Sequence, residues 1–376
     1  MTTIISTIFV FLLVILLHEA GHLVAAKASG IKVNEFAVGM GPKIFGKQKG
    51  ETLYSLRALP IGGYCAMEGE GEDSEDPRAF NNVSIGRRMV TILAGAFMNF
   101  VLAIVAFTII AGFNGVPSTT IGEIVPGSPA EQMGFVPGDK VVVIDHTEIK
   151  EFSDIPKTIA AAQKDTVRVY AVREGRLYAQ NVKVEEKDGQ KMIGIKPKIN
   201  RGATYSVRYG FKQTANVVKE VFQVLGMLFT GKLALSRLSG PVGVIKVIGQ
   251  SAKFGFLNVL AILGLISANL GVVNLLPIPA LDGGRFVMLL IEKLRGKPLS
   301  EKVEYYINLV GFIFVFSFPR YFSSNTRLTP AMPLNSVGTI PISVYPCFWY
   351  MERATAFLAF VSILRSRQPV SSAYFS

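Results

Sequence analysis

Two histidines and a glutamate near the N-terminus have the residue types and the spacing of a metalloprotease centre. His18 and His22 are four residues apart, so they share one face of a helix, and Glu19 lies beside them. Two imidazoles on one face can bind a tetrahedral zinc ion, and a neighbouring carboxylate can accept a proton from the water that attacks a peptide bond. The sequence therefore predicts a zinc-dependent hydrolase centre at residues 18–22.

The setting of these three residues strengthens that prediction. They lie inside the apolar run 4–26, which is long enough to cross a bilayer as a helix. Ionisable side chains within such a helix are energetically costly and usually functional, which disfavours the alternative of histidines that merely pack or cap a soluble helix. Because the run is long and lacks a basic N-terminal region, we interpret it as a retained helix and not as a cleaved signal peptide.

The composition indicates a membrane protein. Half of the 376 residues are hydrophobic and only 18% are charged, which is typical of several membrane spans. The net charge of +12 comes from basic residues spread among acidic ones, so we interpret it as a topology signal and expect no nucleic-acid partner. Cys65 and Cys347 are far apart, which predicts neither a disulfide framework nor a cysteine zinc site.

A third candidate ligand follows another apolar run. Residues 254–281 are uncharged and predict a span, and Pro277 and Pro279 interrupt its helix and free backbone groups near a polar site. Asp282 comes next. If this span begins outside the cell, Asp282 reaches the membrane depth of the two histidines and can supply the third zinc ligand; capping of a helix end is the alternative.

Further apolar runs at 90–113 and 305–318 bring the expected number of spans to about four. The loops 27–88 and 293–302 are short and basic, so both should be cytoplasmic. The N-terminus and the segment 114–202 are then extracytoplasmic, and the zinc lies toward the cytoplasm.

Small and polar residues one turn apart mark one position in the second span. Gly95 and Asn99 predict that another helix packs closely against it.

Residues 31–65 have no helical pattern. The pieces 33–40 and 52–61 read as extended strands broken by glycine and proline, which predicts a hairpin. Two interpretations remain open. The hairpin is either an ordinary surface element or an edge near the zinc to which an unwound substrate adds as a strand.

The segment 117–200 has the composition of a soluble domain, with short strands separated by turns. The motifs at 128–130 and 134–139 resemble those of bacterial PDZ domains, which implies a groove that could accept a peptide C-terminus. His146 follows a strand in a polar loop, and we expect an ordinary surface histidine. Residues 203–253, with an amphipathic piece at 211–229 and a break at 239–243, predict a connector at the membrane surface.

Several motifs in order resemble the site-2 protease family of intramembrane zinc metalloproteases, in particular the bacterial regulator-of-sigma-E protease type with a single PDZ domain. The resemblance covers about residues 1–317. It rests on residues 18–22, 36–45, 60–64, 95–99, the PDZ motifs, 239–243 and 274–283.

The resemblance implies a role for each site residue. His18, His22 and Asp282 would bind Zn²⁺, Glu19 would be the general base, and Asn274 would hold the substrate backbone or stabilise the oxyanion. The hairpin would be a membrane-reentrant sheet that receives the substrate as a strand, with binding residues Phe36, Gly39, Gly41, Gly62, Gly63 and Tyr64.

The resemblance also implies the fold class and the partners. We expect a polytopic α-helical membrane protein with about four transmembrane helices, a membrane-reentrant β-hairpin and an inserted extracytoplasmic PDZ domain of the α+β class. The expected layout is 1–113, 114–202 (PDZ), 203–253 (connector), 254–318 and 319–376 (tail). In the bacterial plasma membrane, the PDZ domain would filter substrates by size. The substrates would be single-span proteins already trimmed outside, such as anti-sigma factors and remnant signal peptides.

The tail departs from this pattern. Pro319 and Arg320 cut the fourth span, and the residues up to 376 are rich in serine and proline. We hypothesise that 319–376 is an aberrant or frame-shifted end outside the catalytic unit. The alternatives to a protease are a catalytically silent PDZ-bearing scaffold and a metal-binding transporter. The intact set of ligands with Glu19 argues against the scaffold, and one compact site with a general base, together with a PDZ domain, fits a transporter poorly.

Overall fold

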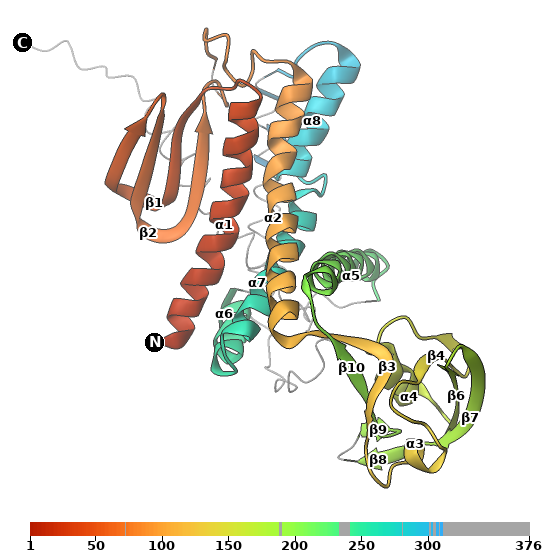
Figure 1. Cartoon of the computed structure of the whole chain (residues 1–376). Helices are drawn as coiled ribbons and strands as arrows, with labels where there is room; N and C mark the ends of the chain where they lie inside the picture. Colours follow the sequence, from red (N-terminus) through yellow and green to blue (C-terminus); the bar gives the residue numbers. More distant parts are fainter. Residues whose placement is uncertain are drawn as a thin grey trace, which may run out of the picture. The chain divides into compact units, whose positions relative to one another are not determined.

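The computed structural model of the chain describes residues 1–71, 73–187, 190–232, 241–279 and 281–300, and residues 302, 303, 306, 307, 309 and 310 (Figure 1). The described residues fall into two compact units, one formed by Met1–Phe107 with the residues from Gly210 onward and the other by Thr108–Tyr209. Most of the expected fourth span (305–318), the tail 319–376 and residues 239 and 240 of the expected break lie outside the described residues.

Three helices are long and apolar enough to cross a membrane, among the residues that the structure describes. They are α1 (Thr2–Ala28), α2 (Ile85–Asn114) and α7 (Phe256–Asn274). Two of these helices match the expected runs closely, but the third is shorter than predicted. It ends at Asn274, because the two prolines that follow cannot donate backbone hydrogen bonds to continue it. The chain then starts a separate helix, α8 (Asp282–Arg295).

The predicted hairpin is a more elaborate sheet beside α1 (Figure 1). Its strands are β1 (Val33–Lys49) and β2 (Thr52–Met67), which bend so that each contributes two segments. Segment 33–38 pairs with 63–67 on one side and lies beside 53–56 on the other, while 43–49 pairs with 52–57. Gly39 makes the bend in β1 possible, since its φ of +82° is a conformation that side chains disfavour.

Helix α8 is held by two ion pairs with segments far away in sequence. A guanidinium nitrogen of Arg88, at the start of α2, donates a hydrogen bond to Oε1 of Glu292 at an N–O distance of 3.0 Å. Both side chains are largely buried. Arg285 pairs with Glu70, which lies in the loop after the sheet. The loop after the sheet therefore anchors α8 through Glu70.

The second unit is built on a six-stranded sheet in the order β10-β3-β4-β6-β7, with β5 paired to β4. We call residues 116–200 the sheet domain. Its buried core is mainly aliphatic and includes Phe135. The carboxylate of Asp139 is also buried and accepts hydrogen bonds from Arg173 and Tyr178. The elements of the domain are β3 (Val116–Ile124), α3 (Pro129–Gln132), β4 (Lys140–Ile144), β5 (Thr147–Glu148), α4 (Asp154–Ala161), β6 (Thr166–Arg173), β7 (Arg176–Lys183), β8 (Glu185–Lys187), β9 (Gln190–Met192) and β10 (Ile195–Asn200).

Two helices occupy the region that was expected to be a connector. One is α5 (Ala203–Phe229), on which Phe211 and Phe222 are exposed while Val217 and Val221 are buried. The other is α6 (Pro241–Lys253), which packs against α1 and α7. Helix α6 is therefore part of the helical packing of the first unit, and a connector at the membrane surface over 203–253 stays a prediction.

Candidate metal centre

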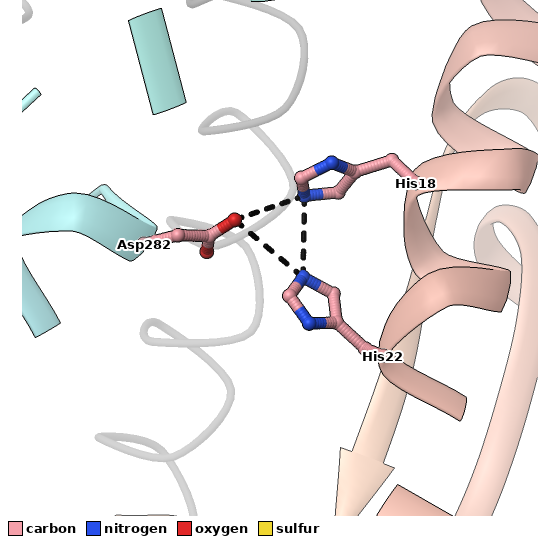
Figure 2. Close-up of side chains that lie close together, drawn as sticks. All are labelled: His18, His22 and Asp282. Atoms are coloured by element: carbon pink, nitrogen blue, oxygen red, sulfur yellow. Dashed lines mark hydrogen bonds and ion pairs between the residues drawn. The ribbon is translucent and has the colours of Figure 1, made fainter. Parts of the chain in front are cut away.

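The structure brings His18, His22 and Asp282 together, although the aspartate is 260 residues from the nearer histidine (Figure 2). Figure 2 shows both imidazoles pointing from α1 toward the carboxylate at the start of α8. His18 is buried, while the side chains of His22 and Asp282 are 12% and 16% exposed. The centre is thus shielded on the His18 side and slightly open on the other.

The distances within this triangle suit a tetrahedral metal. The two Nε2 atoms are 3.2 Å apart, and Oδ2 of Asp282 is 3.3 Å from Nε2 of His18 and 3.6 Å from Nε2 of His22. Ligand atoms bound at zinc distances in a tetrahedron lie about 3.3 Å from one another. The three side chains therefore fit a zinc ion without rearrangement. No second group of His, Cys, Asp and Glu side chains in the described part of the chain is close enough to do this.

The second nitrogen of His22 is held by the backbone of α2. Its Nδ1 lies 2.9 Å from the carbonyl oxygen of Thr91. A carbonyl can only accept a hydrogen bond, so Nδ1 carries the proton and Nε2 keeps the lone pair that a metal needs.

Two further residues of α2 complete this face, and sequence reasoning assigned them only to helix packing. Asn99 is fully buried, with Nδ2 3.0 Å from Nδ1 of His18. Gly95 lies between Thr91 and Asn99, where an added Cβ would collide with both imidazoles. The packing prediction holds for Gly95, but the group that packs against it is the candidate metal centre. Residues 91, 95 and 99 are four apart, as the two histidines are. This matching spacing is the signal in the sequence that could have indicated that this face of α2 packs against the histidines.

The other two predicted catalytic residues also lie near the centre. Asn274, at the end of α7, is buried, and its Nδ2 is 3.5 Å from Nε2 of His18. Glu19 is half-buried on α1, and its Cγ would be 3.7 Å from a Cβ placed on Gly63 of the sheet. The carboxylate that is adjacent to the histidines in sequence therefore faces the strand segment 63–67.

The predicted substrate-binding residues occupy different environments. Of the six, Gly63 lies on the side of the sheet near Glu19, where an added Cβ would meet Cγ of Glu19. The ring of Phe36 is buried in an apolar cluster. The hydroxyl of Tyr64 donates a hydrogen bond to Oε2 of Glu35, with an O–O distance of 2.7 Å. Gly39, Gly41 and Gly62 have positive φ angles and bend the strands. His146, expected to be an ordinary surface residue, is exposed.

Comparison with known proteins gives a consistent result over most of the chain. The model of Peptidase family M50 matches residues 6–318. A Clostridium acetobutylicum protein provisionally named a zinc metalloprotease is 40% identical, covering 82% of this chain and 92% of its own length. The zinc metalloproteases RasP of Geobacillus kaustophilus and Bacillus licheniformis are 31% and 30% identical, and the matches cover 82% and 84% of this chain and 94% and 96% of theirs. A PDZ domain of an SdrC-like protein from Listeria monocytogenes matches 22% of the chain and 87% of that domain, at 22% identity and a TM-score of 0.19.

Proposed function

Because this chain belongs to peptidase family M50 and is a membrane zinc metalloprotease of the site-2 type, we propose that it cleaves single-span membrane proteins within their membrane segments. The single observation that carries the proposal is the triangle of two imidazole nitrogens and one carboxylate oxygen, built between two helices of the first unit. Such a centre beside apolar helices suits hydrolysis of a peptide bond in a membrane segment.

Each residue of the centre has a distinct role in this proposal. His18, His22 and Asp282 hold the zinc ion through the three atoms of the triangle. When bound, zinc acts as a Lewis acid that makes water a nucleophile near neutral pH and polarises the scissile carbonyl. Glu19, on the same helix, accepts the proton from the attacking water and returns it to the leaving amine. Asn274 lies against His18 with its amide, from where it can donate to the substrate carbonyl.

The sheet offers a place for the substrate backbone. A transmembrane helix hides its carbonyls in its own hydrogen bonds, so the substrate must unwind before cleavage, and a new strand pairing would replace the lost bonds. Segment 63–67 pairs with 33–38 on one side and begins at Gly63, beside Glu19. We therefore favour the substrate-receiving interpretation of the hairpin over that of an ordinary surface element. Phe36 and Tyr64 would contribute to substrate binding through their backbone groups. Gly39, Gly41 and Gly62 would contribute by shaping the edge of the sheet that receives the substrate strand.

The finer features of the proposal come from the sequence. The distribution of Lys and Arg supports an orientation with the sheet domain outside the cell and the centre toward the cytoplasm. The sheet domain would be a PDZ domain that restricts access by bulky external domains, and a peptide C-terminus is a candidate ligand for it. The substrates would then be proteins already trimmed outside, such as anti-sigma factors and remnant signal peptides.

The test compares detergent-purified wild type with Glu19→Gln on a model single-span substrate lacking its external domain. The substitution keeps the side-chain shape and the metal ligands but removes the proton acceptor. We expect zinc content to be unchanged and cleavage to be lost. Glu51→Gln, the same change at an exposed carboxylate in the turn between β1 and β2, is the matched control and should cut normally. If wild type retains zinc but cuts none of several trimmed substrates, the proposal fails, and a client-binding scaffold becomes the better interpretation.

A further inference from the structure

The side chain of Asn99 is committed to the candidate metal centre. It is completely buried between the helices, and the hydrogen-bond partner recorded for its carboxamide is Nδ1 of His18, at 3.0 Å. Its backbone is also fixed, since its carbonyl oxygen accepts a hydrogen bond of 2.8 Å from the hydroxyl of Ser267 on α7. Asn99 thus connects α7 to the imidazole of His18 through α2.

The proton on His18 decides whether this imidazole can be a ligand. A neutral imidazole carries one N–H, so Nε2 can bind a metal only when the proton is on Nδ1. For His22, the carbonyl of Thr91 enforces that tautomer. For His18, the partner is a carboxamide, which can present either its oxygen as an acceptor or its nitrogen as a donor. The two arrangements differ by a half-turn of the amide and have opposite consequences for metal binding.

We propose that Asn99 is a positioning residue that turns its carboxamide oxygen toward His18 and accepts the Nδ1–H hydrogen bond. This bond fixes the tautomer and the orientation of the ring, so that Nε2 faces Nε2 of His22 and Oδ2 of Asp282. Hydrogen bonds of this kind to a ligand histidine commonly raise metal affinity by 10- to 100-fold, an order-of-magnitude range. The inference rests on the zinc site of the proposed function, but it concerns zinc binding and not cleavage.

The first measurement is zinc affinity, obtained by chelator competition on the full-length protein in detergent. Asn99→Leu keeps the approximate volume but removes the acceptor, and we expect zinc to bind roughly 10- to 100-fold more weakly. Asn99→Asp keeps an acceptor and has no donor, so it should bind zinc at least as tightly as wild type. The matched control is Asn269→Leu. It also removes a buried amide, but this amide lies on α7 and donates a hydrogen bond to the backbone carbonyl of Leu265 in its own helix. It should leave the affinity unchanged.

The second measurement is ¹⁵N NMR of histidine-labelled protein, which is feasible because the chain has only three histidines. In zinc-loaded wild type and Asn99→Asp, His18 should show a protonated, hydrogen-bonded Nδ1. In Asn99→Leu, that signature should be lost while the signals of His146 stay the same.

Either of two results would overturn the inference. Wild-type affinity and an unchanged His18 signal in Asn99→Leu would show that the amide does not position the ring. Loss of zinc in Asn99→Asp would show that the amide acts as a donor, and this variant alone decides the matter if Asn99→Leu does not fold. A protein that binds zinc as expected here but cuts no substrate would refute only the proposed function.

Discussion

Gly95 of α2 lies directly against the imidazole of His22. A methyl group at this position would be 2.6 Å from Cε1 of His22, closer than real Cβ atoms approach, and 2.7 Å from Cε1 of His18. The hydrogen bonds that α2 makes to both rings from Thr91 and Asn99 therefore depend on the absence of a side chain between them. In this protein, the small residue of a helix-packing pattern is part of the metal centre.

The first prediction concerns this close approach. Gly95→Ala should push the two rings apart or push α2 away, because the methyl group has no free space, and zinc affinity should fall at least about 10-fold. The affinity is measured by chelator competition. Gly112→Ala is the matched control, since it lies on the same helix and an added Cβ there meets no described residue within 4 Å. Wild-type zinc affinity in Gly95→Ala would contradict the packing described here.

The second prediction concerns metal removal. Stripping zinc with a chelator should abolish cleavage and lower the thermal stability of the first unit, and added zinc should restore both. At a free zinc concentration of 1,000 times the dissociation constant, the stabilisation should be about 4 kcal/mol. Asp282→Ala lacks the third ligand, so its unfolding temperature should respond little to the same zinc concentrations. An equal response in wild type and Asp282→Ala would exclude the carboxylate as a ligand.

A third prediction concerns the ion pair that holds α8, the helix that carries Asp282. Arg88→Met should destabilise the protein by about 3 kcal/mol, because Glu292 would be left largely buried without its partner. The double variant Arg88→Met, Glu292→Leu should recover most of that loss, since no unpaired charge remains. Thermal unfolding in detergent measures both. Arg78→Met, which breaks a more exposed pair with Glu51, serves as the control and should change stability by less than about 1 kcal/mol.

The fourth prediction concerns the pH dependence of the sheet domain. Burial raises the pKa of Asp139, but hydrogen bonds from Arg173, Tyr178 and the backbone of Val136 outweigh this effect, so the net pKa lies below its usual value. A carboxylate with a lowered folded-state pKa contributes stability above its unfolded-state pKa, about 3.9, and loses it as the pH falls through the folded-state value. Burial and the bond to Asp139 raise the pKa of Tyr178 to about 12. Its contribution is therefore full below the unfolded-state pKa of about 10 and is lost as the pH rises from there through the folded-state value.

Hydrogen exchange of β6 and β7, measured in the full-length protein, tests this dependence. In wild type, protection should decrease below about pH 4. In Asp139→Asn, protection should be lower at neutral pH and should depend less on acid. Glu148→Gln is the control, because its carboxylate is exposed and pairs with the equally exposed Lys150. A wild-type acid profile in Asp139→Asn would assign the acid sensitivity to other carboxylates.

Much of the first unit could be predicted from the sequence, because the signals are local. Residues four apart, such as His18 and His22, lie on the same face of a helix however that helix is oriented in the fold. The uncharged runs predict membrane-spanning helices because they are long enough to cross a bilayer. Two of the three apolar helices follow this rule closely. The third ends early because a local rule, the missing N–H of proline, limits the apolar run.

Only the tertiary structure decided which of these local features meet. The meeting of Asp282 with the histidines depends on how α8 is anchored, through Arg88 and Arg285, to segments more than 190 residues away. The roles of Gly95 and Asn99 depend on the rotation of α2 about its axis, and the place of Gly63 beside Glu19 depends on the folding of β1 and β2 into four segments. Residue spacing within one segment carries no information about rotation or register between segments, because these are set by side-chain packing across the whole unit.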